Sequence, residues 1–229
     1  MTRKQTVWGT VIGTVVSFCA LAYAEITLPV QPLISDYALV SGGLAPVLIG
    51  MLALAGACLS LAYGLASTEP ARTAATRVLL LAGAAGLMMS AIFPTDPGSS
   101  QIGTLSGEIH RWAAAVVFTS LPVAGWSLAR GRAAAPGWNA VKALSMTSAL
   151  SLAFYLAAHP ASITSPLIDG AAYYGLLERG LVVAEMLLIV VMALAFAGRR
   201  SAARTAGQTT GPASPAEAGP PERQERLAA

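Results

Sequence analysis

Six long apolar segments, separated by short polar stretches, make up most of the chain before Arg199. Each is about 18 to 23 residues long, the length that a helix rising 1.5 Å per residue needs to cross about 30 Å of hydrocarbon. Polar and apolar residues do not alternate within them, which argues against the strands of a membrane β-barrel. The pattern predicts an all-α membrane protein, a bundle of six transmembrane helices, over about residues 7–24, 44–66, 73–93, 112–129, 140–158 and 176–197.

Composition supports a lipid-solvated chain. Of the 229 residues, 55% are hydrophobic and only 11% are charged, whereas soluble domains carry about a quarter charged residues. From Arg199 onward the chain changes to Arg, Ala, Gly, Pro, Ser and Glu, with almost no large apolar side chains. We therefore expect a six-helix transmembrane domain over residues 1–198 and a disordered cytoplasmic tail over 199–229.

The basic residues are distributed very unevenly between the two ends of the predicted helices. Of the fourteen, only Arg111 and Arg179 fall at one end; the other twelve are Arg3, Lys4, Arg72, Arg77, Arg130, Arg132, Lys142, Arg199, Arg200, Arg204, Arg223 and Arg226. The positive-inside rule then places both termini in the cytoplasm, for a multi-pass protein of the plasma membrane. Membrane lipids are the expected partners, because basic inner loops suit anionic headgroups. The basic residues form no patch that indicates nucleic acid.

The first segment allows two interpretations. Arg3 and Lys4, an apolar core and small residues before Glu25 also fit a signal peptide with a cleavage site. We favour a retained helix, because removal leaves five helices and discards Gly9-x-x-x-Gly13. That pair lets two helices approach closely in lipid, either within the chain or, as a weak dimer signal, between copies in a homo-oligomer.

The chain has two cysteines, Cys19 in the first segment and Cys58 in the second. They lie at different depths, and a disulfide requires closely spaced Cα atoms. We therefore expect two buried free thiols.

Candidate chemistry collects at the outer end. We expect a polar external loop over Phe93–Trp112, and an outward-facing pocket lined by Asp36, Asp96 and His110. Carboxylates and imidazoles on one wet face can bind a ligand or act as acid and base. The alternative is that these residues only cap helices and form turns. No metal-ligand spacing is present, so no metal and no cofactor is expected.

The sixth segment adds three candidate ligand-binding residues, Glu178, Arg179 and Glu185. Glu185 follows Glu178 by two helical turns, on the same face and about 10 Å deeper in the membrane. A carboxylate at that depth is costly, so it faces the bundle interior, is protonated or is paired. We place it at or below the floor of the predicted pocket.

Four short motifs near the outer ends of the segments carry a family resemblance. They are Ile34-Ser35-Asp36, Phe93-Pro94-Thr95-Asp96, Ile109-His110 and Gly175-Leu176-Leu177-Glu178-Arg179. In these motifs, and in their order and spacing relative to six spans, the chain resembles the bacterial integral membrane family catalogued as domain of unknown function 998. The resemblance covers about residues 5–198. The resemblance implies a six-helix membrane protein and assigns no activity.

Three classes of function stay open. The first is a membrane protein of unassigned activity that binds a lipid or small molecule in the outward-facing polar pocket. The second is a proton-coupled small-molecule transporter with Glu185 as its proton site. The third is a membrane-embedded lipid-active enzyme that uses Asp36, Asp96, His110 and His159. The absence of known catalytic spacing disfavours an enzyme.

Overall fold

The computed structural model describes residues 2–97, 103–160 and 162–209. Regular structure in these ranges is entirely helical. The chain divides into two units, residues 1–197 and 198–229, of which the first carries the helix bundle.

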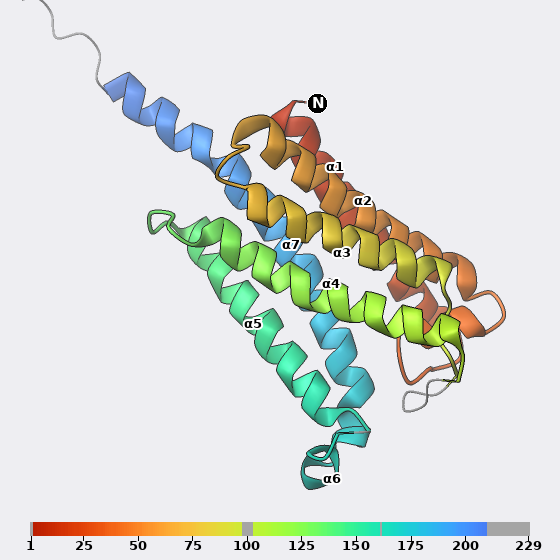
Figure 1. Cartoon of the computed structure of the whole chain (residues 1–229). Coiled ribbons are helices and arrows are strands. Elements are labelled where there is room, and N and C mark those ends of the chain that lie inside the picture. Colours follow the sequence, from red (N-terminus) through yellow and green to blue (C-terminus); the bar gives the residue numbers. More distant parts are fainter. Residues whose placement is uncertain (1, 98–102, 161, 210–229) are drawn as a thin grey trace, which may run out of the picture. The chain divides into compact units, whose positions relative to one another are not determined.

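Six long helices form the described structure (Figure 1). Two short elements, η1 (Ser35–Leu39) and α6 (Ser165–Ile168), lie in the connections that follow α1 and α5. The long helices are α1 (Arg3–Thr27), α2 (Leu44–Thr68), α3 (Ala74–Ile92), α4 (Leu105–Ala129), α5 (Pro136–Ala158) and α7 (Gly170–Thr209). Within the described residues, six helices are long and apolar enough to cross a membrane, the last over Ala172–Gly198. The predicted fold class is therefore confirmed, and the chain is a multi-pass membrane protein.

Several helices extend beyond the predicted membrane spans. The fourth helix begins at Leu105 rather than at 112, because the Thr104 side chain accepts a hydrogen bond from the Gly107 N–H and caps the helix. The external loop predicted over Phe93–Trp112 is correspondingly shorter. The last helix begins at Gly170 and continues to Thr209, whereas disorder was expected from Arg199. Residues 210–229 lie outside the described residues, and for them the disordered tail stays a prediction.

Helix α1 buries a stripe of small polar residues. Thr6, Thr10, Thr14 and Ser17 are buried, while large apolar side chains of the same helix are exposed. The hydroxyl groups of Thr10 and Thr14 each donate to a backbone carbonyl one turn earlier, at 2.9 Å, so two of these side chains are satisfied within the helix. Small residues inside and large apolar residues outside is the arrangement expected for a helix that packs in lipid.

Close packing of α1 on α2 depends on the small residues. A Cβ atom added to Gly13 would lie 2.9 Å from the Ala53 carbonyl oxygen and 3.2 Å from the Ala57 Cβ. Gly13 thus serves a contact within the chain. Both cysteines are free, but Cys19 is exposed, so its predicted burial is wrong; Cys58 is buried as predicted. Cys19 lies away from the buried stripe of α1 and faces the surroundings of the bundle.

Candidate functional site

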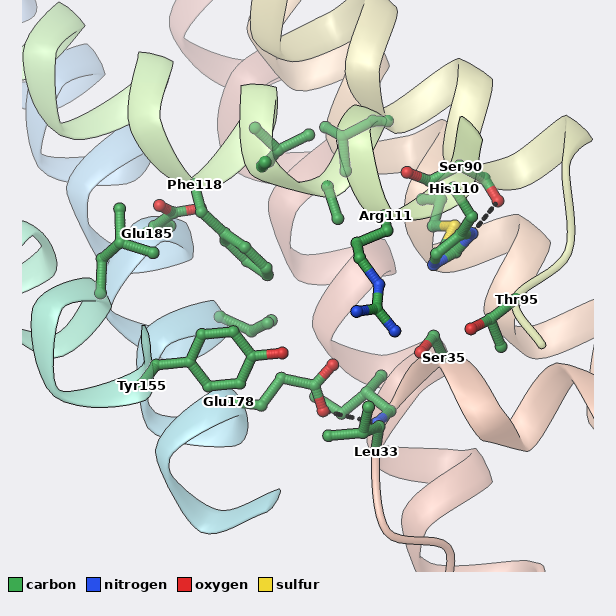
Figure 2. Close-up of a pocket in the computed structure, with 18 of the residues that line it drawn as sticks. Leu33, Ser35, Ser90, Thr95, His110, Arg111, Phe118, Tyr155, Glu178 and Glu185 are labelled. Atoms are coloured by element: carbon green, nitrogen blue, oxygen red, sulfur yellow. Dashed lines mark hydrogen bonds between the residues drawn. The ribbon is translucent and has the colours of Figure 1, made fainter. Parts of the chain in front are cut away.

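A cavity of about 380 Å³ lies between the six long helices (Figure 2). Binding sites for small molecules typically enclose about 300–1,000 Å³. Each helix contributes at least one side chain to the lining, for example Ser17 of α1, Leu54 of α2, Ser90 of α3, Phe118 of α4, Tyr155 of α5 and Glu185 of α7. Most of the wall surface is apolar, and the ionisable side chains that line it include Arg111, Glu178, Glu185, His110 and His159.

His110 lines this cavity from the second turn of α4. Its Nδ1 lies 3.0 Å from the carbonyl oxygen of Ser90 and 2.9 Å from that of Phe93. Since both partners are acceptors, Nδ1 carries a proton, and in the neutral imidazole Nε2 is the acceptor. Both carbonyls belong to the end of α3, where the last carbonyl groups lack partners within the helix. His110 therefore joins α4 to the end of α3 and keeps Nε2 for other interactions.

Aromatic rings form one wall of the cavity. The Tyr155 and Tyr174 rings are stacked with centroids 4.5 Å apart, and the Tyr174 hydroxyl donates to the Tyr155 oxygen at 2.6 Å. Phe118 meets Tyr155 edge-on at 6.2 Å, and His159 meets Tyr174 at 5.2 Å. In Figure 2 the Tyr155 hydroxyl points toward Glu178, and the Arg111 side chain extends into the same space.

Glu178 joins α7 to the segment before η1. It is 6% exposed, and its Oε2 accepts a hydrogen bond of 2.7 Å from the Ile34 N–H (Figure 2). This bond holds Leu33, Ile34 and Ser35 against the cavity, which all three line. The carboxylate therefore both lines the cavity and closes its wall.

Arg179 does not line the cavity. Its guanidinium donates to the carbonyl oxygens of Gln31 and Pro32, at 2.9 and 3.0 Å, and forms an ion pair of 2.8 Å with Glu25. Gly175, one turn earlier, lets the Pro32 carbonyl approach the helix closely. The motif from Gly175 to Arg179 thus attaches residues 31–34 to α7. Ligand binding by Arg179 stays a prediction, without support from its position.

Glu185 lies further along the cavity and is 2% exposed. Within the described part of the chain it takes part in no ion pair, and its Oε1 has no hydrogen-bond partner. The hydroxyl oxygens of Ser17 and Ser90, which also line the cavity, likewise have no partner there. The sequence left open whether Glu185 faces the bundle interior, is protonated or is paired. The structure shows that it faces the interior and has no charged partner among the described residues.

Asp36 and Asp96 do not line this cavity, whereas His110 does, so a pocket shared by the three residues stays a prediction without support from the two aspartates. Asp36 is 4% exposed; its Oδ2 accepts from the Leu33 N–H at 3.3 Å. Burial raises the pKa of its carboxyl group, although the Leu33 bond opposes the shift. Asp36 stabilises the turn that presents Leu33 and Ser35. Asp36 therefore supports the cavity wall without lining the cavity.

Asp96 is a helix-capping residue. Its carboxylate accepts from the Thr104 hydroxyl at 2.7 Å, the Thr104 N–H at 3.1 Å and the Gly103 N–H at 2.8 Å. These bonds hold the start of α4, where the helix dipole also favours a negative charge. The turn-and-cap interpretation, left open by the sequence, describes Asp96 correctly.

The pH dependence of stability reports this cap. The hydrogen bonds from Thr104 and Gly103 lower the pKa of Asp96 in the folded protein. Its contribution is therefore present above the ordinary aspartate pKa of about 3.9 and is lost as the pH falls through the lower folded-state value. We expect Asp96→Asn to melt below the wild type at neutral pH, and the difference to shrink on acidification. A difference in melting temperature that stays constant down to about pH 3 would contradict this.

Sequence reasoning missed the aromatic wall and Arg111. Tyr155 and Tyr174 gave no specific signal, because tyrosines at helix ends usually belong to an interfacial belt. Arg111 carried a usable signal, because it is one of only two basic residues at the acidic end of the helices. Ser17 and Ser90 gave none, since isolated serines are common in membrane helices.

One known protein family matches most of the chain. Residues 9–195 match the family described as "Protein of unknown function (DUF998)". No curated protein and no solved structure matches the chain significantly. The matched range includes every cavity-lining residue from Ser17 to Glu185.

Proposed function

The chain belongs to the DUF998 family of proteins of unknown function, and from the geometry of its cavity we propose that it binds a small amphipathic molecule within the membrane. One observation carries the proposal. All six membrane-spanning helices line one cavity whose wall is mainly apolar and whose polar groups include His110, Arg111 and Glu178.

The wall chemistry indicates the class of molecule. Leu54, Phe118 and Val182 offer apolar contact along the cavity, which suits a hydrocarbon or aromatic body. At one end, His110 Nε2 and the Tyr155 hydroxyl offer an acceptor and a donor to a polar group. A lipid-like or other small amphiphile satisfies both parts of the cavity.

The orientation completes the proposal. With twelve of the fourteen basic residues on the cytoplasmic side, the His110 end of the cavity faces the outside of the bacterial cytoplasmic membrane. The molecule then comes from the outer leaflet or the external solution. Anionic lipids contact the basic loops on the opposite side.

A second function, proton-coupled transport of the same molecule, is favoured by Glu185. Its carboxyl group is buried, and Oε1 has no hydrogen-bond partner among the described residues, which suits a proton site in a transporter. Uptake by proteoliposomes that follows an imposed pH gradient, and is lost in Glu185→Gln, would support transport. Binding without such uptake would leave the binding function alone.

Filling the cavity tests the proposal directly. Ala115 lines the cavity, whereas its neighbour Val116 is 41% exposed on the outer face of α4. Native mass spectrometry of protein purified from membranes is expected to show a bound small molecule in the wild type and in Val116→Phe, and at least about tenfold less in Ala115→Phe, for a loss of about 1.4 kcal/mol or more in binding. Equal amounts in all three proteins would contradict the proposal. Thermal melting of the three proteins controls for folding.

A further inference from the structure

We infer that the molecule carries an ammonium group, which the carboxylate of Glu185 binds within the cavity. The inference rests on the proposed function and names the chemistry of the ligand. It follows from Glu185 itself, from the other acidic residue of the cavity and from the aromatic wall.

Glu185 needs a partner that the described residues do not supply. It is 2% exposed, its Oε1 forms no hydrogen bond, and no Lys, Arg or His of the described chain forms an ion pair with it. A buried carboxylate is stable only when it is paired or neutralised. Because Glu185 lines the cavity, a bound molecule can reach it.

An ionised carboxylate selects among ligand groups. It has only acceptor atoms, so it repels anions and gains nothing from ethers or esters. A hydroxyl group can donate one hydrogen bond, whereas an ammonium group donates and also neutralises the charge. Charge-assisted hydrogen bonds are roughly twice as strong as neutral ones. The ammonium group is therefore the preferred partner.

Glu178 does not compete for the same group. Its Oε2 already accepts from the Ile34 N–H, and Arg179, the next residue in the chain, adds a positive charge nearby. Two helical turns, about 10 Å, separate the two glutamates along α7. The ammonium group thus lies deep in the cavity, and the body of the ligand extends from there toward His110.

The aromatic wall adds to the selectivity. Phe118 lines the cavity together with Glu185, and its ring is continuous with those of Tyr155 and Tyr174. Aromatic faces attract cations, most strongly where water is excluded. An acidic group and aromatic rings that line one cavity together are a typical environment for an alkylammonium ligand.

A matched pair of ligands tests the inference. 4-Phenylbutylamine and 4-phenylbutan-1-ol differ only in the terminal group, and their binding to the protein in lipid nanodiscs is measured by calorimetry at pH 7. We expect the amine to bind at least about tenfold more tightly, a difference of about 1.4 kcal/mol. The preference is expected to disappear in Glu185→Gln, which keeps alcohol binding, and to persist in Glu108→Gln, which changes an exposed glutamate of α4.

The outcomes separate the two proposals. Equal affinity of the wild type for amine and alcohol, with both lost in Ala115→Phe, overturns the ammonium inference and supports the cavity. An amine preference that survives in Glu185→Gln also overturns the inference. Failure of both ligands to bind the wild type counts against the cavity as a binding site. The wild-type comparison decides the inference even where a variant does not fold.

Discussion

Glu185→Leu is expected to make the protein more stable, by about 1–3 kcal/mol, the usual cost of leaving a buried polar group unsatisfied. If Glu185 had a hydrogen-bonded partner, leucine would leave that partner unpaired and destabilise the fold. Its Oε1 has none among the described residues, so the substitution removes the cost. Unfolding of the detergent-solubilised protein by denaturant measures the difference.

Glu178 is the matched control, two turns away on the same helix. Glu178→Leu leaves the half-buried Ile34 N–H without its acceptor and is expected to destabilise the protein by about 1–3 kcal/mol. The two substitutions make the same chemical change in one cavity and are expected to have opposite signs. If Glu185→Leu lowers stability as much as Glu178→Leu, Glu185 has a structural role and the account of it as a binding residue fails.

Gly175→Ala is expected to destabilise the protein by about 1–3 kcal/mol, the usual cost of overpacking. A Cβ atom at this position overlaps the Pro32 carbonyl group, which is backbone and cannot rotate away. The displaced segment also loses its hydrogen bonds to Arg179. The measurement is again denaturant unfolding in detergent.

Gly180 provides the control on the same helix, because a Cβ atom added there meets no atom within 4 Å. Gly180→Ala is expected to raise stability by up to about 1 kcal/mol, because alanine has the higher helix propensity. Gly175→Ala has the same gain in propensity, so the difference between the two substitutions reports the overlap with Pro32. Equal effects of the two changes would show that residues 31–34 do not need to approach α7.

The fold was predictable because length and composition alone identify a helix that crosses a membrane. The residues at which the helices begin and end were less predictable. Glu108, His110 and Arg111 were assigned to a loop because they are polar, yet they lie in the first two turns of α4. Thr104 and Asp96 start that helix through capping hydrogen bonds within residues 96–107, and a hydropathy pattern does not contain such bonds.

Of the predicted site residues, His110, Glu178 and Glu185 line the cavity, whereas Asp36 and Asp96 do not. Glu185 and Glu178 are costly at their depth, so the sequence alone singles them out, and both line the cavity. Asp36 and Asp96 occur in turns, where an aspartate that caps a helix and one that binds a ligand look alike. The aromatic wall required knowledge of which faces of α4, α5 and α7 point inward.

The motifs of the family resemblance acquire a common meaning in the structure. His110 joins α4 to α3, Asp96 caps α4, and the residues from Gly175 to Arg179 attach the segment that contains Ile34. All of them stabilise one end of the bundle, around the polar part of the cavity. Their shared role is to build this end of the cavity, and His110 and Glu178 also line it.

An experimental density map of the protein in lipid nanodiscs, with a rigid antibody fragment to aid alignment, tests the central claim most directly. We expect elongated density between His110 and Glu185, with one end at hydrogen-bond distance, about 3 Å, from the Glu185 carboxylate. A map in which Glu185 is bonded to a side chain of the protein, and the rings of Phe118 and Tyr155 close the space between the helices, would contradict it.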